Sequence, residues 1–356
     1  MNKPINQQAL DGIKAARELQ QVAAQFSLQI TPAMKKLIDP NDGKDPIAAQ
    51  FIPTPDELFI HPEEIKDPIS DYTFSPVEGI VHRHTDRVLL KLLNVCAVHC
   101  RFCFRREQIN VPENNLSDAG LDKALDYIAQ HSEIWEVILT GGDPLVLSDR
   151  RIKDIINRLN AIPHIKIIRI HTRIPVVNPV RITSVLIDAL KGRAPVYILL
   201  HCNHPREMTE QARKACALLV DAGLPMLSQS VLLRGVNDNP ETLSELMRCF
   251  VENRIKPHYL HHGDLARGTT HFRTTVERGR NLLRGLRSLS GLCQPTYLLD
   301  IPGGHGKVSL APAYAEKTAE GWAVEDYQGN HHNYRDAVTD NAEAPAPEAP
   351  NETSES

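Results

Sequence analysis

Three of the chain's seven cysteines, Cys96, Cys100 and Cys103, stand close together in the stretch NVCAVHCRFCFRRE. Thiolates that gather in one loop are ligands for soft metals, and iron–sulfur clusters usually take four of them. Three thiolates leave one metal position open, as a catalytic site requires. The spacing is also compatible with a structural zinc site whose fourth ligand, for example a histidine, comes from elsewhere. The spacing alone therefore predicts a metal centre and leaves the metal open.

Two glycine-rich stretches at predicted strand ends are the other candidates for chemistry. The stretch TGGDP, residues 140–144, contains Gly141, Gly142 and Asp143, and glycine lets a backbone approach a ligand closely. The stretch IPGGHGK ends at Lys307, and a lysine in such a loop can form a Schiff base with a carbonyl compound. Taken alone, a common turn and a solvated surface loop are the alternatives for these two stretches.

The composition excludes several other classes of protein. The formal net charge is −4 and aromatic residues make up 5% of the chain, so neither a basic surface nor stacking platforms for nucleic acid are expected. No run of about 18 apolar residues occurs and the N-terminus has no apolar signal core, so we expect no membrane span and a cytoplasmic location. Clustered cysteines in an odd total are typical of metal or redox chemistry, not of a disulfide framework.

The elements that must position these residues alternate along the chain from about residue 86. Short apolar runs are separated by amphipathic stretches, a pattern typical of βα units around a parallel sheet or partial barrel. The runs that we predict as strands are 87–93, 136–141, 166–172, 196–202, 226–233, 256–262 and 296–301. The stretches that we predict as helices are 117–131, 148–160, 206–223 and 239–253. In such folds the chemistry lies at the C-terminal ends of the strands, where the three candidate stretches stand.

We predict four segments in the chain. Residues 1–80 form a helical, proline-rich region, with a helix near the start and mostly loop from Asp39 to Asp71. Residues 81–310 form the α/β barrel-like domain, and residues 311–335 a short C-terminal extension. Residues 336–356 are acidic and rich in proline and alanine, so they cannot bury a core and should be a disordered tail.

Together these features resemble the radical S-adenosylmethionine (SAM) enzymes. The motif C-x3-C-x2-C directly after the first barrel strand is typical of that superfamily, and TGGDP stands where it has a Gly-Gly-Glu-like motif. The resemblance implies a radical SAM partial (β/α)6 barrel with a helical N-terminal extension. It also implies that the three cysteines hold a [4Fe–4S] cluster and that Gly141, Gly142 and Asp143 bind SAM, which chelates the open iron.

Longer motifs narrow the resemblance to lysine 2,3-aminomutase and its relatives, over roughly residues 70 to 310. The stretches RIHTRIPVVNPVRIT, HCNHPRE, QSVLLRGVND, GDLARGTTHFRT and DIPGGHGK occur in the order of that family. The resemblance implies a radical isomerase in which Lys307 holds pyridoxal phosphate (PLP) as an internal aldimine. By the same resemblance Arg83 and Arg87 bind the PLP phosphate, and Arg105 binds the substrate carboxylate, roles that suit a guanidinium group.

The resemblance also implies the substrate. The branch that acts on lysine holds the distant ammonium group with two aspartates, which correspond to Asp264 in GDLARG and Asp300 in LLDIPGG. A branch that acts on glutamate should carry a basic or neutral residue there. We therefore expect conversion of L-lysine to β-lysine by migration of the amino group from C2 to C3.

Some residues depart from the free-standing lysine enzymes. His84 stands where they place a tyrosine beside PLP. His261 replaces a tyrosine of many members, as in relatives that make β-lysine for elongation factor P. No cysteine follows Cys293, so the C-terminal zinc cluster of many free-standing enzymes is not expected. The remaining cysteines are most simply core residues; they are Cys202, Cys216, Cys249 and Cys293.

Alternatives stay open at this point. The same reaction could serve modification of elongation factor P, or the substrate could be another amino acid. Lys307 could be structural in a radical SAM enzyme without PLP. The chain could also be a non-catalytic iron–sulfur or zinc module. The partners that we expect are L-lysine, an electron donor such as flavodoxin or ferredoxin, and further copies of the chain, without nucleic acid or membrane.

Overall fold

A computed structural model describes residues 7–110 and 115–337 of the chain. The contacts divide the chain into two compact units, Met1–Ala311 and Pro312–Ser356. Most of the predicted disordered tail, from residue 338 onward, lies outside the described residues. The predicted division into four segments stays a prediction.

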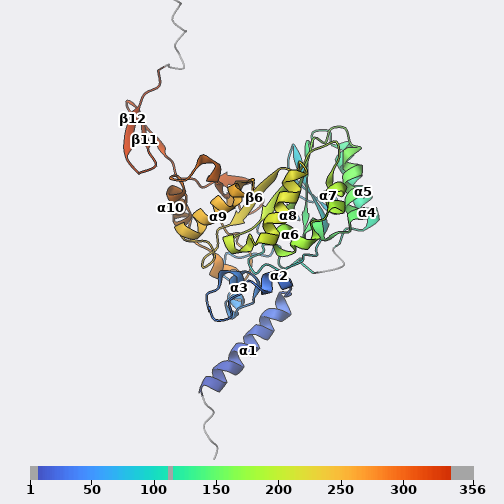
Figure 1. Cartoon of the computed structure of the whole chain (residues 1–356), viewed down its shortest axis with the longest axis horizontal. Coiled ribbons are helices and arrows are strands. Elements are labelled where there is room, and N and C mark those ends of the chain that lie inside the picture. Colours follow the sequence, from blue (N-terminus) through green and yellow to red (C-terminus); the bar gives the residue numbers. More distant parts are fainter. Residues whose placement is uncertain (1–6, 111–114, 338–356) are drawn as a thin grey trace, which may run out of the picture. The chain divides into compact units, whose positions relative to one another are not determined.

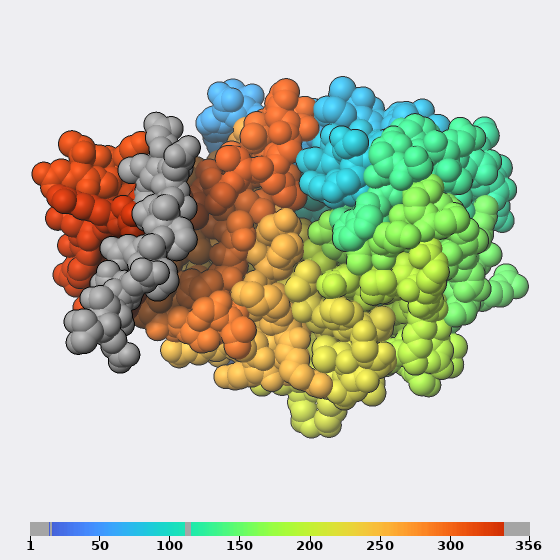
Figure 2. Space-filling model, turned by 90° about the horizontal axis from the view of Figure 1, so that it is seen from above, coloured from blue at the N-terminus to red at the C-terminus, as the bar shows by residue number. Residues whose placement is uncertain are grey.

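The first unit is built on one nine-stranded sheet whose strands follow each other in chain order. Strands β2 to β8 are parallel, and β1 and β9 pair antiparallel at its two edges. The strands are β1 Ile80–His84, β2 Arg87–Leu93, β3 Glu136–Gly141, β4 Ile167–Thr172, β5 Val196–His201, β6 Met226–Val231, β7 Ile255–His261, β8 Thr296–Asp300 and β9 Lys307–Ser309. The seven predicted strands are β2 to β8, and the predicted α/β partial barrel is confirmed. Figure 2 shows successive segments of this first unit next to each other on one face, from cyan through green and yellow to orange.

The first three helices precede β1, and the later helices connect the strands and cover the outer side of the sheet (Figure 1). They are α1 Gln7–Gln25, α2 Pro32–Lys35, α3 Pro46–Phe51, α4 Asp118–Gln130, α5 Asp149–Asn160, α6 Ile174–Val177, α7 Ser184–Leu190, α8 Glu210–Asp221, α9 Pro240–Glu252 and α10 Val276–Leu286. Short 3-10 helices are η1 Pro55–Leu58, η3 Pro144–Val146, η4 Pro179–Arg181, η5 Pro205–Glu207, η6 Thr270–Phe272 and η7 Gly291–Cys293. The four predicted connecting helices are confirmed as α4, α5, α8 and α9.

The longer connecting helices begin at polar capping residues that the sequence provides. The side chain of Ser117 accepts a hydrogen bond from the Gly120 amide at the start of α4, and Asn239 caps α9 through the Thr242 amide. Such caps satisfy amides that have no partner inside the helix. An N-cap also begins α10, where the Thr275 side chain accepts a hydrogen bond from the Arg278 amide. We did not predict this helix.

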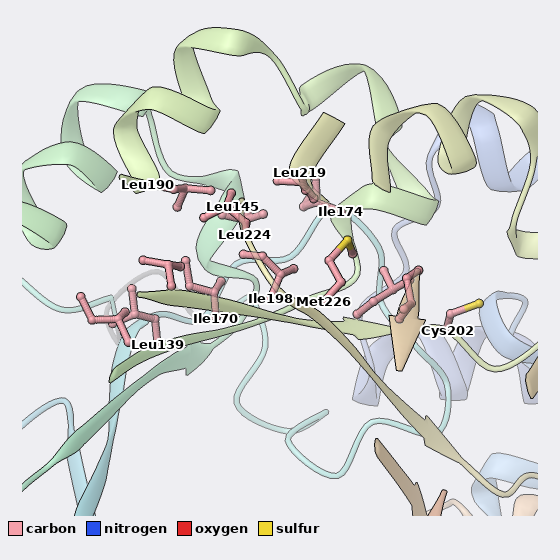
Figure 3. Packing of buried hydrophobic residues seen from close by; sticks show 14 of the residues in the cluster. Leu139, Leu145, Ile170, Ile174, Leu190, Ile198, Cys202, Leu219, Leu224 and Met226 are labelled. Atoms are coloured by element: carbon pink, nitrogen blue, oxygen red, sulfur yellow. The ribbon is translucent and has the colours of Figure 1, made fainter. Parts of the chain in front are cut away.

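The core lies between the outer face of the sheet and the helices. Figure 3 shows strand residues such as Leu139, Ile170 and Ile198 facing helix and loop residues such as Leu190 and Leu219. All of them are at most 2% exposed. Burying such a side chain contributes about 1.5–3 kcal/mol, so this layer stabilises the frame that carries the strand ends. The four remaining cysteines are also buried, which confirms their prediction as core residues.

Successive side chains along a strand point to opposite sides of the sheet, so burial alternates with a period of two residues. In β4, Ile168, Ile170 and Thr172 are buried, whereas Arg169 and His171 are partly exposed and line an internal cavity. Because side chains alternate along a strand, the apolar pattern that builds the core also points polar residues into the cavity.

The second unit contains a three-stranded antiparallel sheet that the sequence analysis did not predict. Its strands are β10 Ala315–Thr318, β11 Gly321–Glu325 and β12 His331–Tyr334. They are short and have no buried side chains, so they lack the buried apolar runs that marked the barrel strands. Among the helices of the two described ranges, none combines the length and apolar character needed to cross a bilayer.

Candidate active site

One cavity of about 700 Å³ is lined by all the residues that the sequence analysis singled out for chemistry. They are Arg83, Arg87, Cys96, Cys100, Cys103, Arg105, Gly141, Gly142, Asp143, Asp264, Asp300 and Lys307. The cavity lies at the C-terminal ends of the parallel strands: Gly141 ends β3, and Asp300 ends β8. The fold therefore brings together residues that are up to 224 positions apart, counted from Arg83 to Lys307.

The three cysteines follow β2 in a loop on the cavity wall, and none of them forms a disulfide. Burial raises the pKa of the Cys103 thiol to about 11 and raises the pKa of Cys96 as well. A bound metal reverses this preference, because a coordinating thiol is deprotonated. Among the described residues, no three His, Cys, Asp or Glu side chains converge on a single metal ion. A cubane cluster binds each thiolate through a different iron, so its ligands need not converge in that way.

The N-terminal region holds this cysteine loop from outside the barrel. The carboxylate of Glu57, in η1, pairs with Arg101 at 2.5 Å and also with Arg106. Both arginines flank Cys103 in the chain and are buried. The Arg101 amide donates to the Gln50 carbonyl at 2.9 Å. The sequence analysis missed this clamp, because an acidic residue in a proline-rich stretch gives no local signal of a buried partner.

A further arginine, Arg173, lies directly against the cysteine loop. Its Nη1 atom is 2.8 Å from the Cys100 Sγ, and its Nη2 atom is 2.7 Å from the Glu207 carboxylate. It follows β4 and is nearly fully buried. We did not single it out, although the motif RIHTR placed it at a strand end. A buried cation therefore lies beside one of the three predicted metal ligands.

The glycine pair allows the end of β3 to touch the cysteine loop. The Gly142 amide donates to the Leu93 carbonyl at 2.5 Å, and a Cβ atom on Gly142 would lie 2.2 Å from the Val95 oxygen. Gly141 has φ +110°, and a Cβ atom there would lie 2.4 Å from the Leu93 oxygen. The space for a side chain is thus filled by the backbone that leads into the cysteines. Here a close backbone contact requires glycine, in addition to any contact with a ligand.

Gly142→Ala should destabilise the cysteine loop. The added methyl group overlaps a backbone oxygen, and forced overpacking of this kind costs about 1–3 kcal/mol. We expect a lower melting temperature and less iron per chain after reconstitution. The matched control is Gly285→Ala in α10, where nothing lies within 4 Å of the new methyl group and no fall in stability is expected. Equal melting temperatures of the two variants would contradict the close contact.

The carboxylate of Asp143 accepts its hydrogen bonds from groups within the protein. It accepts hydrogen bonds from Thr172 Oγ1 at 2.7 Å, the Arg173 amide at 2.7 Å and the Leu145 amide at 3.1 Å. Asp143 therefore joins the end of β3 to the end of β4 and starts η3. Its predicted role in binding SAM stays a prediction.

The predicted anion-binding arginines lie at another part of the wall. Arg83 is on β1 and Arg105 follows the cysteine loop, and both side chains pair with Asp71. Arg87, at the start of β2, is less buried and pairs with Asp86 at 2.7 Å. His84 lies on the same hairpin and also lines the cavity. Burial and Arg87 lower the pKa of His84, so this ring is neutral near pH 7.

Lys307 approaches the cavity through the glycine loop that follows β8. Gly303, Gly304 and Gly306 all have positive φ, a conformation that favours glycine. Lys307 begins β9, and its Nζ atom lies 2.5 Å from the Asp300 Oδ1 atom. Its side chain is 40% exposed, so the amine can be reached by a ligand in the cavity. The antiparallel pairing of Lys307 with Asp300 fixes this arrangement.

The two predicted substrate aspartates differ in their electrostatics. Burial would raise the pKa of Asp300, but the hydrogen bonds and charges of His261 and Lys307 lower it to about 2. The His261 Nδ1 atom is 3.2 Å from the Asp300 Oδ2 atom. For Asp264, burial and the nearby charge of Asp300 raise the pKa to about 7. One carboxylate is therefore firmly ionised, and the other is poised to ionise when a cation arrives.

A histidine pair that we did not predict lies at the ends of β4 and β5. The His201 Nε2 atom is 3.2 Å from the His171 Nδ1 atom, and both residues line the cavity. Burial is the main cause that lowers both pKa values, that of His201 to about 3. Both rings are therefore neutral and can serve as hydrogen-bonding groups. The sequence signal that could have found them is that each histidine stands near the C-terminal end of a predicted strand.

The cavity wall has polar atoms that are ready for a polar ligand. Within the described structure, the buried atoms Arg83 Nε, His171 Nε2 and His261 Nε2 make no hydrogen bond. Buried polar groups normally have partners, so these atoms indicate binding of a polar molecule. Together with the three thiols, the accessible lysine and the paired arginines, they fit an iron–sulfur cluster, a phosphate and an amino acid.

Comparisons with known proteins agree with this chemistry. Residues 90–247 match the family model of the radical SAM superfamily. The chain is 44% identical over 295 residues to L-lysine 2,3-aminomutase of Clostridium subterminale, covering 83% of this chain and 71% of that protein. It is 38% identical over 302 residues to glutamate 2,3-aminomutase of Clostridioides difficile, covering 85% and 71%. A solved radical SAM methyltransferase from Sphaerobacter thermophilus matches with TM-score 0.44 and 20% identity over 62% of this chain and 68% of that chain.

Proposed function

The chain belongs to the L-lysine 2,3-aminomutase family of radical SAM enzymes, and on that premise we propose that it converts L-lysine to β-lysine. The observation that carries the proposal is the single cavity that unites the cysteine loop, Lys307 and two aspartates. Family membership alone leaves the substrate open, because a glutamate 2,3-aminomutase is also among the relatives. The charges of the cavity argue for lysine.

The cofactor roles follow from the groups on the cavity wall. Cys96, Cys100 and Cys103 would hold a [4Fe–4S] cluster, and the backbone at the end of β3 would contact SAM. Lys307 would bind PLP covalently, with Arg83 and Arg87 at its phosphate. When bound, the cluster and SAM supply hydrogen abstraction by a radical, and PLP supplies the π system through which an amino group migrates.

The protein's own residues would orient the substrate. Arg105 binds the α-carboxylate, and Asp264 and Asp300 bind the ε-ammonium group. In this structure Asp300 is paired with Lys307. The substrate ammonium group would compete with Lys307 for Asp300, and Asp264 would be its second carboxylate. A glutamate side chain would instead meet two carboxylates, which repel it.

The other partners are part of the same proposal. The reaction needs a one-electron donor, for which we propose a protein such as flavodoxin or ferredoxin. The free state of all seven cysteines is consistent with a reducing compartment such as the cytoplasm. Self-association of the chain stays a prediction.

Asp264 should make lysine binding dependent on pH. The ionised carboxylate attracts the ammonium group, and with a pKa of about 7 its ionised fraction falls as the pH drops below 7. The charges that face it are Asp300, Lys307, Arg105 and Asp71. We expect the KM for L-lysine to rise severalfold from pH 8 to pH 6.

The variant Asp264→Asn isolates this effect. It should raise the KM at pH 8 at least tenfold, flatten its dependence on pH, and leave SAM binding unchanged. Steady-state kinetics across this pH range provide the measurement. An unchanged KM in Asp264→Asn would remove this residue from the substrate site.

The function itself is tested anaerobically. The protein is reconstituted with iron, sulfide and PLP, reduced, and given SAM with either L-lysine or L-glutamate. We expect β-lysine by mass spectrometry and no β-glutamate. Release of 5′-deoxyadenosine without either product would keep the radical SAM chemistry and reject lysine as substrate. Absence of both, with a well-formed cluster, would reject the proposed activity.

A further inference from the structure

The segment of residues 67–75, here called the Asp71 segment, is fixed in an unusual conformation at the edge of the cavity. The carboxylate of Asp67 accepts hydrogen bonds from the amides of Asp71 at 2.9 Å and Tyr72 at 3.0 Å. Ser70 has φ +54°, which is rare for a residue with a side chain. Such strain persists only where the surroundings determine it, and it often occurs at functional sites. Here it turns Asp71 inward.

Asp71 is the counter-ion of both predicted anion-binding arginines. Its Oδ2 atom accepts from Arg105 Nε and Nη2, each at 2.9 Å, and its Oδ1 atom pairs with Arg83. Lys91 lies 3.9 Å from the same carboxylate. The Asp71 side chain is 1% exposed. Burial opposes its ionisation, but the charges of Arg105, Lys91 and Arg83 outweigh burial and lower its pKa. One carboxylate thus faces three cations, so positive charge remains for ligands.

The same segment also contacts the loop that carries Lys307. The Gly303 amide donates to the Pro68 carbonyl at 3.3 Å, and a Cβ atom on Gly304 would lie 2.4 Å from the Phe74 ring. The Arg83 guanidinium lies over the same ring, 5.5 Å from its centroid. The Asp71 segment therefore touches the lysine loop and Arg83 together, which are the two ends of the proposed PLP site.

We propose that Asp71 is a positioning residue that holds Arg83 and Arg105 in fixed orientation, so that one carboxylate sets both the cofactor phosphate site and the substrate carboxylate site. This inference rests on the proposed function, which assigns those anions to the two arginines. It assigns a role in the site to the N-terminal region, which lies outside the barrel strands.

If Asp71 acted only through its charge, its removal would strengthen phosphate binding, which is the opposite of what positioning predicts. Removing a negative charge beside two guanidiniums strengthens the attraction for phosphate. Positioning dominates here because Asp71 binds Arg105 through two nitrogens and pairs with Arg83 through Nη2, while the Arg83 Nε atom makes no hydrogen bond in the described structure. Without Asp71, three neighbouring cations repel each other and the flexible arginine side chains lose their common anchor.

The test uses Asp71→Asn, which keeps the shape of the side chain and removes its charge. The cluster-reconstituted full chain is titrated with PLP and, separately, with pyridoxal, which lacks the phosphate. Attachment to Lys307 is trapped with borohydride and measured by mass spectrometry. The control is Asp221→Asn, which removes a surface ion pair with Arg254. We expect Asp71→Asn to weaken PLP about tenfold, to leave pyridoxal unchanged, and to raise the KM for L-lysine with little change in kcat.

The outcomes separate the inference from the proposed function. Unchanged or tighter PLP binding in Asp71→Asn, or an equal loss for PLP and pyridoxal, would overturn the positioning role. If the wild-type chain attaches neither compound to Lys307, the proposed PLP site itself fails. If Asp71→Asn does not fold, Asp71→Glu keeps the charge and displaces both arginines, and it should also weaken PLP without affecting pyridoxal. Unchanged PLP binding in a folded Asp71→Glu variant would likewise overturn the role.

Discussion

The Cys100→Ala protein is expected to hold no [4Fe–4S] cluster and to release no 5′-deoxyadenosine from SAM. Three cysteines line the cavity, and a cluster with one open iron needs all three thiolates. Cys100 is the most informative of them, because Arg173 lies 2.8 Å from its sulfur. Its loss removes a ligand and also the sulfur contact of that buried guanidinium, which keeps only its polar contacts such as the pair with Glu207. Lysine turnover should fall at least a thousandfold.

Iron and sulfide analysis, visible absorbance and deoxyadenosine release provide the measurement. The matched control is Cys216→Ala, because Cys216 is a fully buried core residue of α8. The control should lower the melting temperature and keep the full iron content. A Cys100→Ala protein with a complete cluster and normal SAM cleavage would show that the ligands lie elsewhere, and the zinc alternative predicts zinc, not iron, in the purified wild-type chain.

The barrel could be predicted because it depends on local patterns, whereas the roles of the site residues came from the family resemblance and stay predictions. Strand β4 shows why: its apolar period of two predicts a strand, and the same period places Arg169 and His171 on the opposite side. The C-terminal ends of β2, β3 and β8 then place the cysteines, the glycine pair and the lysine loop at one edge. Parallel strands meet at that edge, so spacing along the chain was sufficient to gather these residues.

The counter-ions of the site could not be predicted in this way. Asp71 meets Arg105 across 34 positions, and Glu57 meets Arg101 across 44 positions. Both acidic residues stand in a stretch that we predicted as mostly loop, where acidic residues are usually solvated. Only the folded chain shows that these carboxylates are buried against arginines. The N-terminal region therefore matters more to the site than its composition indicates.

The edge strands, and the strands within the predicted C-terminal extension, were missed for a related reason. Strand β9 has three exposed residues, and β10 to β12 have few buried apolar side chains. Short strands at an edge or in a small sheet need not carry a buried face, so they leave no clear alternation. Lys307 is at the start of β9, so its pairing with Asp300 emerged only from the structure.

Lys307→Ala should abolish covalent attachment of PLP while leaving the iron–sulfur absorbance intact. The lysine loop and the cysteine loop occupy different parts of the wall, and Lys307 donates its hydrogen bonds to the Asp300 carboxylate. Lysine turnover should fall at least a thousandfold. Borohydride trapping with mass spectrometry measures the attachment, and iron analysis measures the cluster. Lys317→Ala, an exposed lysine of β10 in the second unit, is the control.

This variant also decides between the two enzyme hypotheses. If Lys307 were only structural, its main role would be the ion pair with Asp300. Lys307→Gln or Lys307→Ala would then change stability, and turnover would need no PLP in the wild-type chain or in either variant. If Lys307 binds the cofactor, its removal frees Asp300 from its ammonium partner and still abolishes turnover, because the substrate ammonium site alone cannot move an amino group. Full β-lysine formation by Lys307→Ala would reject the PLP role and favour a radical SAM reaction without PLP. Loss of product with the cluster retained places the migration chemistry at this lysine.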